Sequence, residues 1–280
     1  MKRFTVISLL CLVAVSAVAQ QKADIIVSYD VRSKDWVTDS LRTHRMTLLA
    51  NAAGSKFFND ISLWTDSLKS TPEGKEQWSQ IIMAACMTRT PDGGMAFDMR
   101  KGPVKKEHTY VFTSLPEENL TLYDVFAGDP GYYREPLAEM QWQIADTTAS
   151  ILGYECVGAR TDYHGRIWTA WFAPELPVPF GPWKLHGLPG LILKAESDNG
   201  ITYKATGIQH TDRIMTPMYS AGDYGRVDRS KALADDDHYL NNKEAMLRAR
   251  FAGSVRVTTP SSSEKYDGRR YASEPDYLSD

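Results

Sequence analysis

Apolar and polar residues alternate along much of this chain. Every second position is apolar in residues 25–31 and again in residues 46–50. A period of two places apolar side chains on one face of a β-strand. The pattern therefore predicts two strands that begin a β-meander. Further strands are predicted at residues 110–112, 120–122, 140–144, 151–161, 166–172, 191–195 and 201–206.

Two regions show helical spacing instead. Residues 61–87 carry apolar positions three and four apart, interrupted at residues 71–74, where Thr71 can cap a second helix and Pro72 fits its first turn. Residues 230–252 are predicted as a further helix. We interpret its acidic run, Asp235 to Asp237, as a solvated helix start that complements the helix dipole.

The order of these elements favours one fold class. About ten strands and two or three helices occur in runs, without strict alternation. The sequence therefore predicts an α+β protein with a large, curved antiparallel sheet. One domain is expected over residues 20–256. Residues 257–280 are polar and rich in proline, serine and glycine, which predicts a flexible C-terminal tail.

The N-terminus predicts export. Lys2 and Arg3 precede an apolar stretch over residues 4–18, and Ala17-Val18-Ala19 supplies a small-residue cleavage signal. We expect residues 1–19 to be a signal peptide cleaved near Ala19, leaving a protein of the periplasm or cell envelope. A membrane anchor is disfavoured because the run is shorter than the ~20 apolar residues that a spanning helix needs.

Charge and cysteine content narrow the function further. Loss of the signal peptide changes the net charge from −3 to −5, and this mild acidity argues against a nucleic-acid partner. The mature chain has no second apolar run long enough to span a membrane. It keeps Cys86 and Cys156, which could form a disulfide in an oxidising compartment or remain two buried thiols. Both alternatives stay open.

The most unusual segment covers residues 168–193 and combines five prolines with five aromatic residues. Proline removes backbone donors and restricts φ, so most of this segment can be neither helix nor central strand. We expect an ordered, extended loop. Within it, Leu188-Pro189-Gly190-Leu191 is typical of a type II turn.

The same segment carries a family resemblance. The run GPWKLHGLPGLILKAES resembles the GLPGLI family of secreted Bacteroidetes proteins, whose name corresponds here to residues 187–192. The similarity in order and spacing extends over residues 142–203. It implies a layout similar to the half-barrel of periplasmic lipoprotein carriers. The family's function is uncharacterised, so the resemblance implies no catalytic residue.

Motifs for catalysis, metal binding or cofactor binding are lacking in the sequence. The six histidines lie far apart, and neither C-x-x-C nor H-E-x-x-H occurs. The sequence also lacks G-x-S-x-G and glycine-rich phosphate-binding patterns. We therefore expect no catalytic residue, no metal and no cofactor. Carboxylates such as Glu135 could act in pairs, but their partners cannot be assigned from sequence.

The candidate ligand-binding residues all come from the proline-rich segment: Trp171, Phe180, Trp183, Lys184 and His186. The aromatic side chains would contact an apolar ligand. Lys184 could neutralise an anionic ligand or lie in solvent. His186 could face a ligand or bind carbonyl groups of the loop.

Three functions remain open at this stage. The first is non-enzymatic binding of a hydrophobic or amphipathic ligand, such as a lipid or peptide, in a sheet cavity that the loop closes. The second is a structural or interaction module of the envelope, with an outer-membrane transporter as the partner. The third is a hydrolase with an unrecognised site.

Overall fold

A computed structural model describes residues 21–89, 93–97, 101–102, 105, 107–250 and 265–278. The predicted signal peptide lies outside the described residues. In the described part of the chain, no helix combines the length and the apolar character needed to cross a membrane.

A single large sheet dominates the structure. It has twelve strands in the order β14-β8-β7-β6-β3-β2-β1-β13-β12-β11-β10-β9, and among the described pairings only β14 with β8 is parallel. The two end strands do not pair, so the sheet is not closed. A separate short hairpin joins β4 (Met87–Arg89) and β5 (Met95–Phe97). The strands of the large sheet are β1 (Ile25–Lys34), β2 (Leu41–Ala50), β3 (Gly54–Phe58), β6 (Tyr110–Ser114), β7 (Asn119–Phe126), β8 (Asp129–Pro136), β9 (Gln143–Ile151), β10 (Tyr154–Tyr163), β11 (Arg166–Ala173), β12 (Leu191–Ser197), β13 (Thr202–His210) and β14 (Gly225–Arg226).

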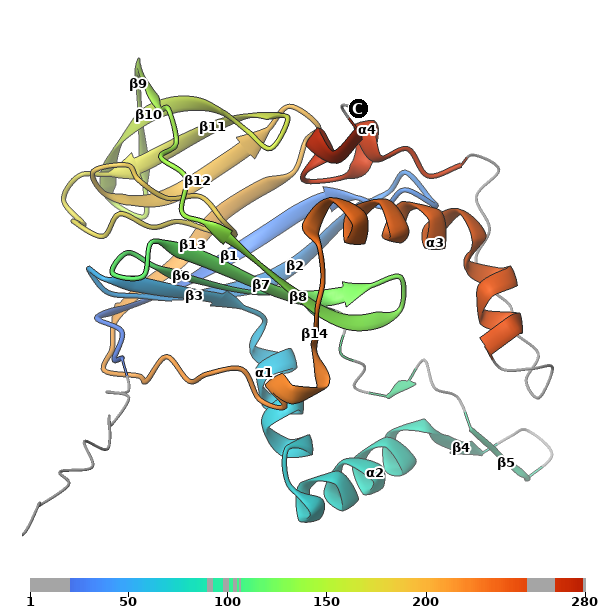
Figure 1. Ribbon diagram of the computed structural model, residues 1–280. Coiled ribbons are helices and arrows are strands. Elements are labelled where there is room, and N and C mark those ends of the chain that lie inside the picture. The colour runs from blue at the N-terminus through green and yellow to red at the C-terminus, as the bar shows by residue number, and fades with distance from the viewer. Residues whose placement is uncertain are drawn as a thin grey trace, which may run out of the picture.

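The sheet bends so that β9 to β12 rise above the layer formed by β3, β6, β7 and β8 (Figure 1). Alternation along the strands decides which side chains lie inside the bend. Ile25, Val27 and Tyr29 belong to the main hydrophobic core, and the hydroxyl of Tyr29 donates to the Ile192 carbonyl at 2.6 Å. The predicted α+β class with a large, curved, mainly antiparallel sheet is confirmed.

Two helices follow β3 and project from the outer face of the sheet (Figure 1): α1 (Asp60–Lys69) and α2 (Pro72–Cys86). The Thr71 hydroxyl caps α2 by accepting from the Gly74 amide at 3.0 Å, as its sequence position predicts. Leu63 of α1 packs into a second, smaller core with Leu49 and Phe58. The outer face of the sheet is thus covered over only part of its area.

The other helices lie beside the bend. They are α3 (Arg229–Arg250) and the single turn α4 (Gly268–Tyr271), which brings the described α-helices to four where two or three were expected. Asp235 is exposed and pairs with Lys231 at 2.5 Å, whereas Asp236 and Asp237 are partly buried. The interpretation of this run as a solvated helix start is therefore wrong for its last two residues.

The proline-rich segment is ordered and irregular, as predicted, but it is not extended as far as Trp183. The chain reverses direction there, because Phe180 forms an antiparallel bridge with His186. The predicted type II turn is also wrong: Gly190 has a φ of 157°, far from the roughly +80° that this position of a type II turn requires, and the Leu191 amide donates to the Leu176 carbonyl. Gly190 is required for another reason, since a Cβ there would lie 2.3 Å from the Ala173 carbonyl oxygen.

Residues 265–278 correct the expectation of a flexible tail. This C-terminal segment contains α4 and a 3₁₀ turn at Pro275–Leu278, and it packs against the sheet. The Arg166 guanidinium of β11 donates to the carbonyls of Arg269 and Ala272, both at 2.7 Å. Contacts distant in sequence order this segment, and its composition does not reveal them.

Cys86 and Cys156 are free and buried. The structure therefore favours the second of the two alternatives, in which both cysteines behave as small apolar side chains.

Candidate ligand-binding cavity

A cavity of about 310 Å³ lies between the inner face of the sheet, α3 and the C-terminal segment. Its sheet side is mainly apolar and aromatic. The residues that form this floor include Met46, Phe57, Leu122, Ile201, Trp183 and Tyr203.

The C-terminal segment and α3 form the opposite wall. Leu233 of α3 and three tyrosines of the C-terminal segment, Tyr266, Tyr271 and Tyr277, line this side. The Tyr277 hydroxyl donates to Asp237 at 2.5 Å, which ties the segment to α3. The wall opposite the floor is thus built partly from the segment that was expected to be flexible.

One side of the cavity is acidic. Glu107 precedes β6, Asp124 lies on β7, and Asp236 and Asp237 lie on α3; all four line the cavity. Thr109 donates to Asp124 at 2.5 Å, and the Ala127 amide donates to Asp236 at 3.0 Å. Three separate parts of the fold therefore bring carboxyl groups to one small volume.

Burial raises the pKa values of these carboxyl groups. Burial and the nearby carboxylate of Asp124 raise the pKa of Glu107 to about 7. Burial raises the pKa of Asp124 to about 6, although Thr109 and the Val125 amide donate to it. Burial also raises the pKa values of Asp236 and Asp237. The common cause is loss of water around the charged form.

Few cations oppose this acidic side. In the described part of the chain, the ion-pair partner of Glu107 is His44, whose Nδ1 lies 3.7 Å from the carboxylate. Burial and Arg42 lower the pKa of His44, so this imidazole is a weak counter-charge at neutral pH. Ion-pair contacts with Asp124 are absent from the same described residues.

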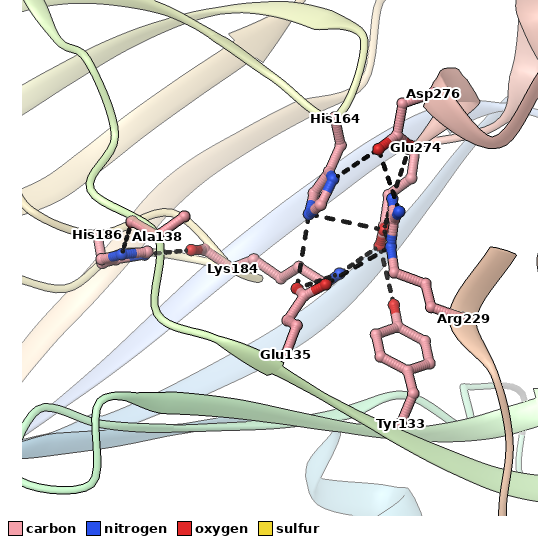
Figure 2. A network of polar contacts seen from close by, with 9 residues as sticks. All are labelled: Tyr133, Glu135, Ala138, His164, Lys184, His186, Arg229, Glu274 and Asp276. Atoms are coloured by element: carbon pink, nitrogen blue, oxygen red, sulfur yellow. Dashed lines mark hydrogen bonds and ion pairs between the residues drawn. The ribbon is translucent and has the colours of Figure 1, made fainter. Parts of the chain in front are cut away.

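A second charged cluster lies beside the cavity and has the opposite character. The Lys184 ammonium is fully buried and lies 2.8 Å from both Glu135 and Glu274 (Figure 2). The Arg229 guanidinium lies 2.5 Å from Glu274 and 2.6 Å from Asp276. These contacts attach the C-terminal segment to β8, α3 and the proline-rich loop.

In this second cluster, ion pairs with neighbouring cations lower the carboxyl pKa values that burial would otherwise raise. Burial alone would raise the pKa of Glu135, but contacts with His164 and Lys184 hold it at about 2. Arg229 and His164 likewise lower the pKa of Asp276 against the effect of burial. We call this set of residues, Glu135, His164, Lys184, Arg229, Glu274 and Asp276, the paired cluster.

Part of the paired cluster has the spacing of a metal site. Donor atoms of Glu135, His164 and Glu274 lie within 4.8 Å of one another. The Lys184 ammonium already bridges the two carboxylates at ion-pair distance. Its charge stands where a cation would bind, so the geometry supports an ion-pair network at this place.

The five candidate binding residues are distributed over different environments. Trp183 lines the cavity, at a φ of +57° that non-glycine residues rarely adopt. Lys184 is buried and neutralises the protein's own carboxylates, in contrast to both roles considered for it. Phe180 is 1% exposed within the core and does not line the cavity. The loop therefore supplies part of the floor and does not close the cavity.

His186 and Trp171 lie elsewhere. The ring nitrogens of His186 contact the carbonyl oxygens of Lys184 at 2.8 Å and Ala138 at 3.1 Å, away from the paired cluster (Figure 2). This histidine connects the loop to the strand-free segment after β8. Trp171 lies on the outer face of β11, with the Lys194 ammonium 4.3 Å from its ring centre.

Most of the cavity wall has no recognisable signal in the sequence. Glu107, Asp124, Glu274 and Tyr203 belong to segments far apart in the chain, and none stands in a recognisable motif. The acidic run lies on a helix with few apolar residues, so its sequence shows no apolar stripe that would indicate which face is buried. A fold was needed to bring these residues together.

Comparison with known families gives one match. Residues 161–194 match the model of a family described as "Protein of unknown function (Porph_ging)". This range covers β11, the proline-rich loop and the start of β12. Among curated proteins, no sequence matches the chain.

Solved structures show a similarity of fold. Two crystal forms of PNGF-II give TM-scores of 0.50 and 0.49, at 12% and 13% sequence identity, over 77% and 75% of this chain. The chain spans about a third of the length of PNGF-II. A Vibrio parahaemolyticus domain, described by its role in outer membrane lipoprotein sorting, gives a TM-score of 0.24 at 10% identity, over 68% of this chain and 86% of that one. At these identities the first similarity concerns the fold, and the last adds no argument.

Proposed function

We propose that this protein binds a small amphipathic molecule, without transforming it, in the cavity between the sheet and the C-terminal segment. One observation carries the proposal: a partly open cavity of about 310 Å³ with an apolar floor and polar groups on one side. Small-molecule sites commonly have this size and this division of lining. The proposal includes no cofactor.

The energetics of the cavity support binding. Apolar surface buried by a ligand contributes roughly 25 cal/mol per Å². Four of the floor residues, Met46, Phe57, Leu122 and Tyr203, lie on paired strands, so little ordering of this part of the protein would oppose binding. Trp183 is held at a strained φ where it meets the cavity, and such backbone strain is concentrated at functional positions.

A series of eight-carbon probes tests the proposal. We expect at least one of 1-octanol, octylamine and octanoate to bind saturably in calorimetric titration. The variant Ser273→Phe, which fills the cavity from the C-terminal segment, should abolish that binding. Ser79→Phe, on the exposed surface of α2, is the matched control and should not. Absence of saturable binding by all three probes would overturn the proposal.

We also propose that the chain is an exported envelope protein of the GLPGLI family. The support is the motif at residues 187–192, which lies inside the matched range, together with the N-terminal pattern of residues 1–19. Mass spectrometry of the protein recovered from the periplasm should find a new N-terminus near position 20. An uncleaved chain in the cytoplasm would contradict this.

A second candidate function is an interaction module, with an outer-membrane transporter as the partner. It is favoured by the large apolar side chains that α1 and α2 expose: Ile61 is 56%, Trp64 48% and Met83 51% exposed. Exposed apolar residues close together mark interaction surfaces. Cross-linking in whole envelopes should capture one transporter with the native chain and lose it with the double substitution Trp64→Ser and Met83→Ser. Equal capture by both chains would contradict this function.

A further inference from the structure

The charge around the cavity is unevenly distributed. Glu107, Asp124, Asp236 and Asp237 line one side, whereas His44 is the one basic side chain among the described residues that line the cavity. The nearby Lys184 and Arg229 are engaged by Glu135, Glu274 and Asp276. Lys184 and Arg229 therefore hold the wall in place. Arg42, Lys105 and Lys243 act on the carboxyl groups of the acidic side without a described ion pair to them, and the cavity lining carries an excess of negative charge.

This excess of negative charge destabilises the folded protein. Burial is the main cause that disfavours ionisation of Glu107 and Asp124, and neighbouring carboxyl groups add to it, Asp124 beside Glu107 and Asp236 beside Asp124. The charges of Arg42 and Lys105 oppose this effect only in part. Buried charges are normally paired with an opposite charge. The hydrogen-bond donors that do reach these groups, such as the Thr109 hydroxyl and the Ala127 amide, are neutral. A cation entering the cavity would provide the missing charge.

The remaining walls suit an organic cation better than a hydrated metal ion. Trp183 and Tyr203 lie in the floor, and Tyr266, Tyr271 and Tyr277 lie in the opposite wall. Aromatic rings attract ammonium groups and also bury alkyl carbon. A hard divalent cation would instead need six or more oxygen ligands around one point. Among the described residues, the group with the spacing of a metal site is Glu135, His164 and Glu274, and the carboxyl groups of the acidic side do not converge in this way.

We propose that the cavity selects amphipathic molecules with a primary ammonium head group, which binds between Glu107, Asp124 and Asp236 while the apolar part lies on the floor. This inference rests on the proposed function and names the chemical class of its ligand. It also assigns Glu107 and Asp124 as the residues that determine specificity.

The test compares three probes with the same chain length and different heads. Calorimetric titration at pH 8 should give a dissociation constant for octylamine about tenfold lower than that for 1-octanol, and octanoate should bind more weakly than both. Asp124→Asn keeps the shape and the acceptor for Thr109 but removes the charge. It should reduce the preference for octylamine over 1-octanol by about tenfold. Glu107→Gln is the second variant, and circular dichroism verifies that each variant is folded.

The matched control removes a carboxylate outside the cavity. Asp146 is an exposed residue of β9, and Asp146→Asn should leave the affinity for octylamine unchanged. Equal affinities for octylamine and 1-octanol, or an unaltered preference in both cavity variants, would overturn the inference and leave the proposed function standing. Failure of all three probes to bind would overturn the proposed function as well.

Discussion

Two groups of acidic residues lie beside the same cavity, and they behave in opposite ways. In the paired cluster, Glu135 contacts Lys184 and has a pKa of about 2. On the acidic side of the cavity, Glu107 has a pKa of about 7. Both side chains are only partly exposed, Glu135 at 15% and Glu107 at 29%, and the neighbouring cation makes the difference.

The comparison separates two uses of buried charge. The paired cluster connects β8, the proline-rich loop, α3 and the C-terminal segment, and its charges are satisfied within the protein. On the acidic side of the cavity, the ion pair among the described residues is that of Glu107 with His44, which is a weak counter-charge at neutral pH. Charges of the first kind hold a structure together once their partners are in place, whereas charges of the second kind favour a cationic ligand.

The largest expected effect comes from removal of the central cation. Lys184→Met leaves Glu135 and Glu274 buried next to each other without the ammonium between them. We expect the free energy of unfolding to fall by about 3–5 kcal/mol, measured by chemical denaturation. Lys194→Met is the matched control, because its pair with Glu196 is partly exposed and should cost less than about 1 kcal/mol. Similar losses in both variants would show that the paired cluster contributes no more to stability than a partly exposed ion pair.

A smaller effect is expected from the partner on the C-terminal segment. Glu274→Gln keeps the shape of the side chain but weakens its contacts with Lys184, Arg229 and Tyr133. The free energy of unfolding should fall by about 1–3 kcal/mol. Trypsin should also cleave faster after Arg269, because the segment opens more often. Glu196→Gln is the exposed control, and an unchanged cleavage rate in Glu274→Gln would contradict the role of this contact.

Glu107→Gln should change the free energy of unfolding in the opposite direction and stabilise the protein. The folded state raises the pKa of Glu107 from 4.5 to about 7, so it favours the protonated form. The energetic penalty is absent below pH 4.5, grows as the pH rises through this window, and is complete above pH 7. Glu107→Gln should therefore increase the free energy of unfolding by about 1–2 kcal/mol at pH 8 and change it little at pH 4.

Chemical denaturation at both pH values measures this dependence. Asp146→Asn removes an exposed carboxylate of β9 and serves as the control at each pH. A gain in Glu107→Gln of the same size at pH 4 and pH 8 would show that ionisation of Glu107 is not its cause.

The smallest expected effect concerns the location of the cavity. Trp171 lies on the outer face of β11, so Trp171→Leu should change the affinity for 1-octanol by less than about twofold. Trp183→Leu removes part of the floor and should weaken the same affinity by about tenfold. Calorimetric titration distinguishes them. A larger loss in Trp171→Leu than in Trp183→Leu would place the ligand outside the cavity.

Local patterns predicted much of the fold. The period of two located β1, β2 and most later strands, and Thr71 with Pro72 located the start of α2, because strand faces and helix caps depend on near neighbours in sequence. The proline-rich segment was correctly predicted to be ordered and irregular. The predicted turn type was wrong and the reversal at Trp183 was not predicted, since both depend on contacts with Leu176 and on the bridge between Phe180 and His186.

The sequence by itself determined the α+β class and the antiparallel strands. Of the five candidate ligand-binding residues that it suggested, Trp183 lines the cavity. Only the tertiary structure decided that Lys184 faces Glu135 and Glu274 and that residues 265–278 form a wall. The same holds for the meeting of Glu107, Asp124 and Asp236. The physical reason is that strand periodicity is a local property, whereas the pairing or isolation of a buried charge depends on which distant segments the fold brings beside it.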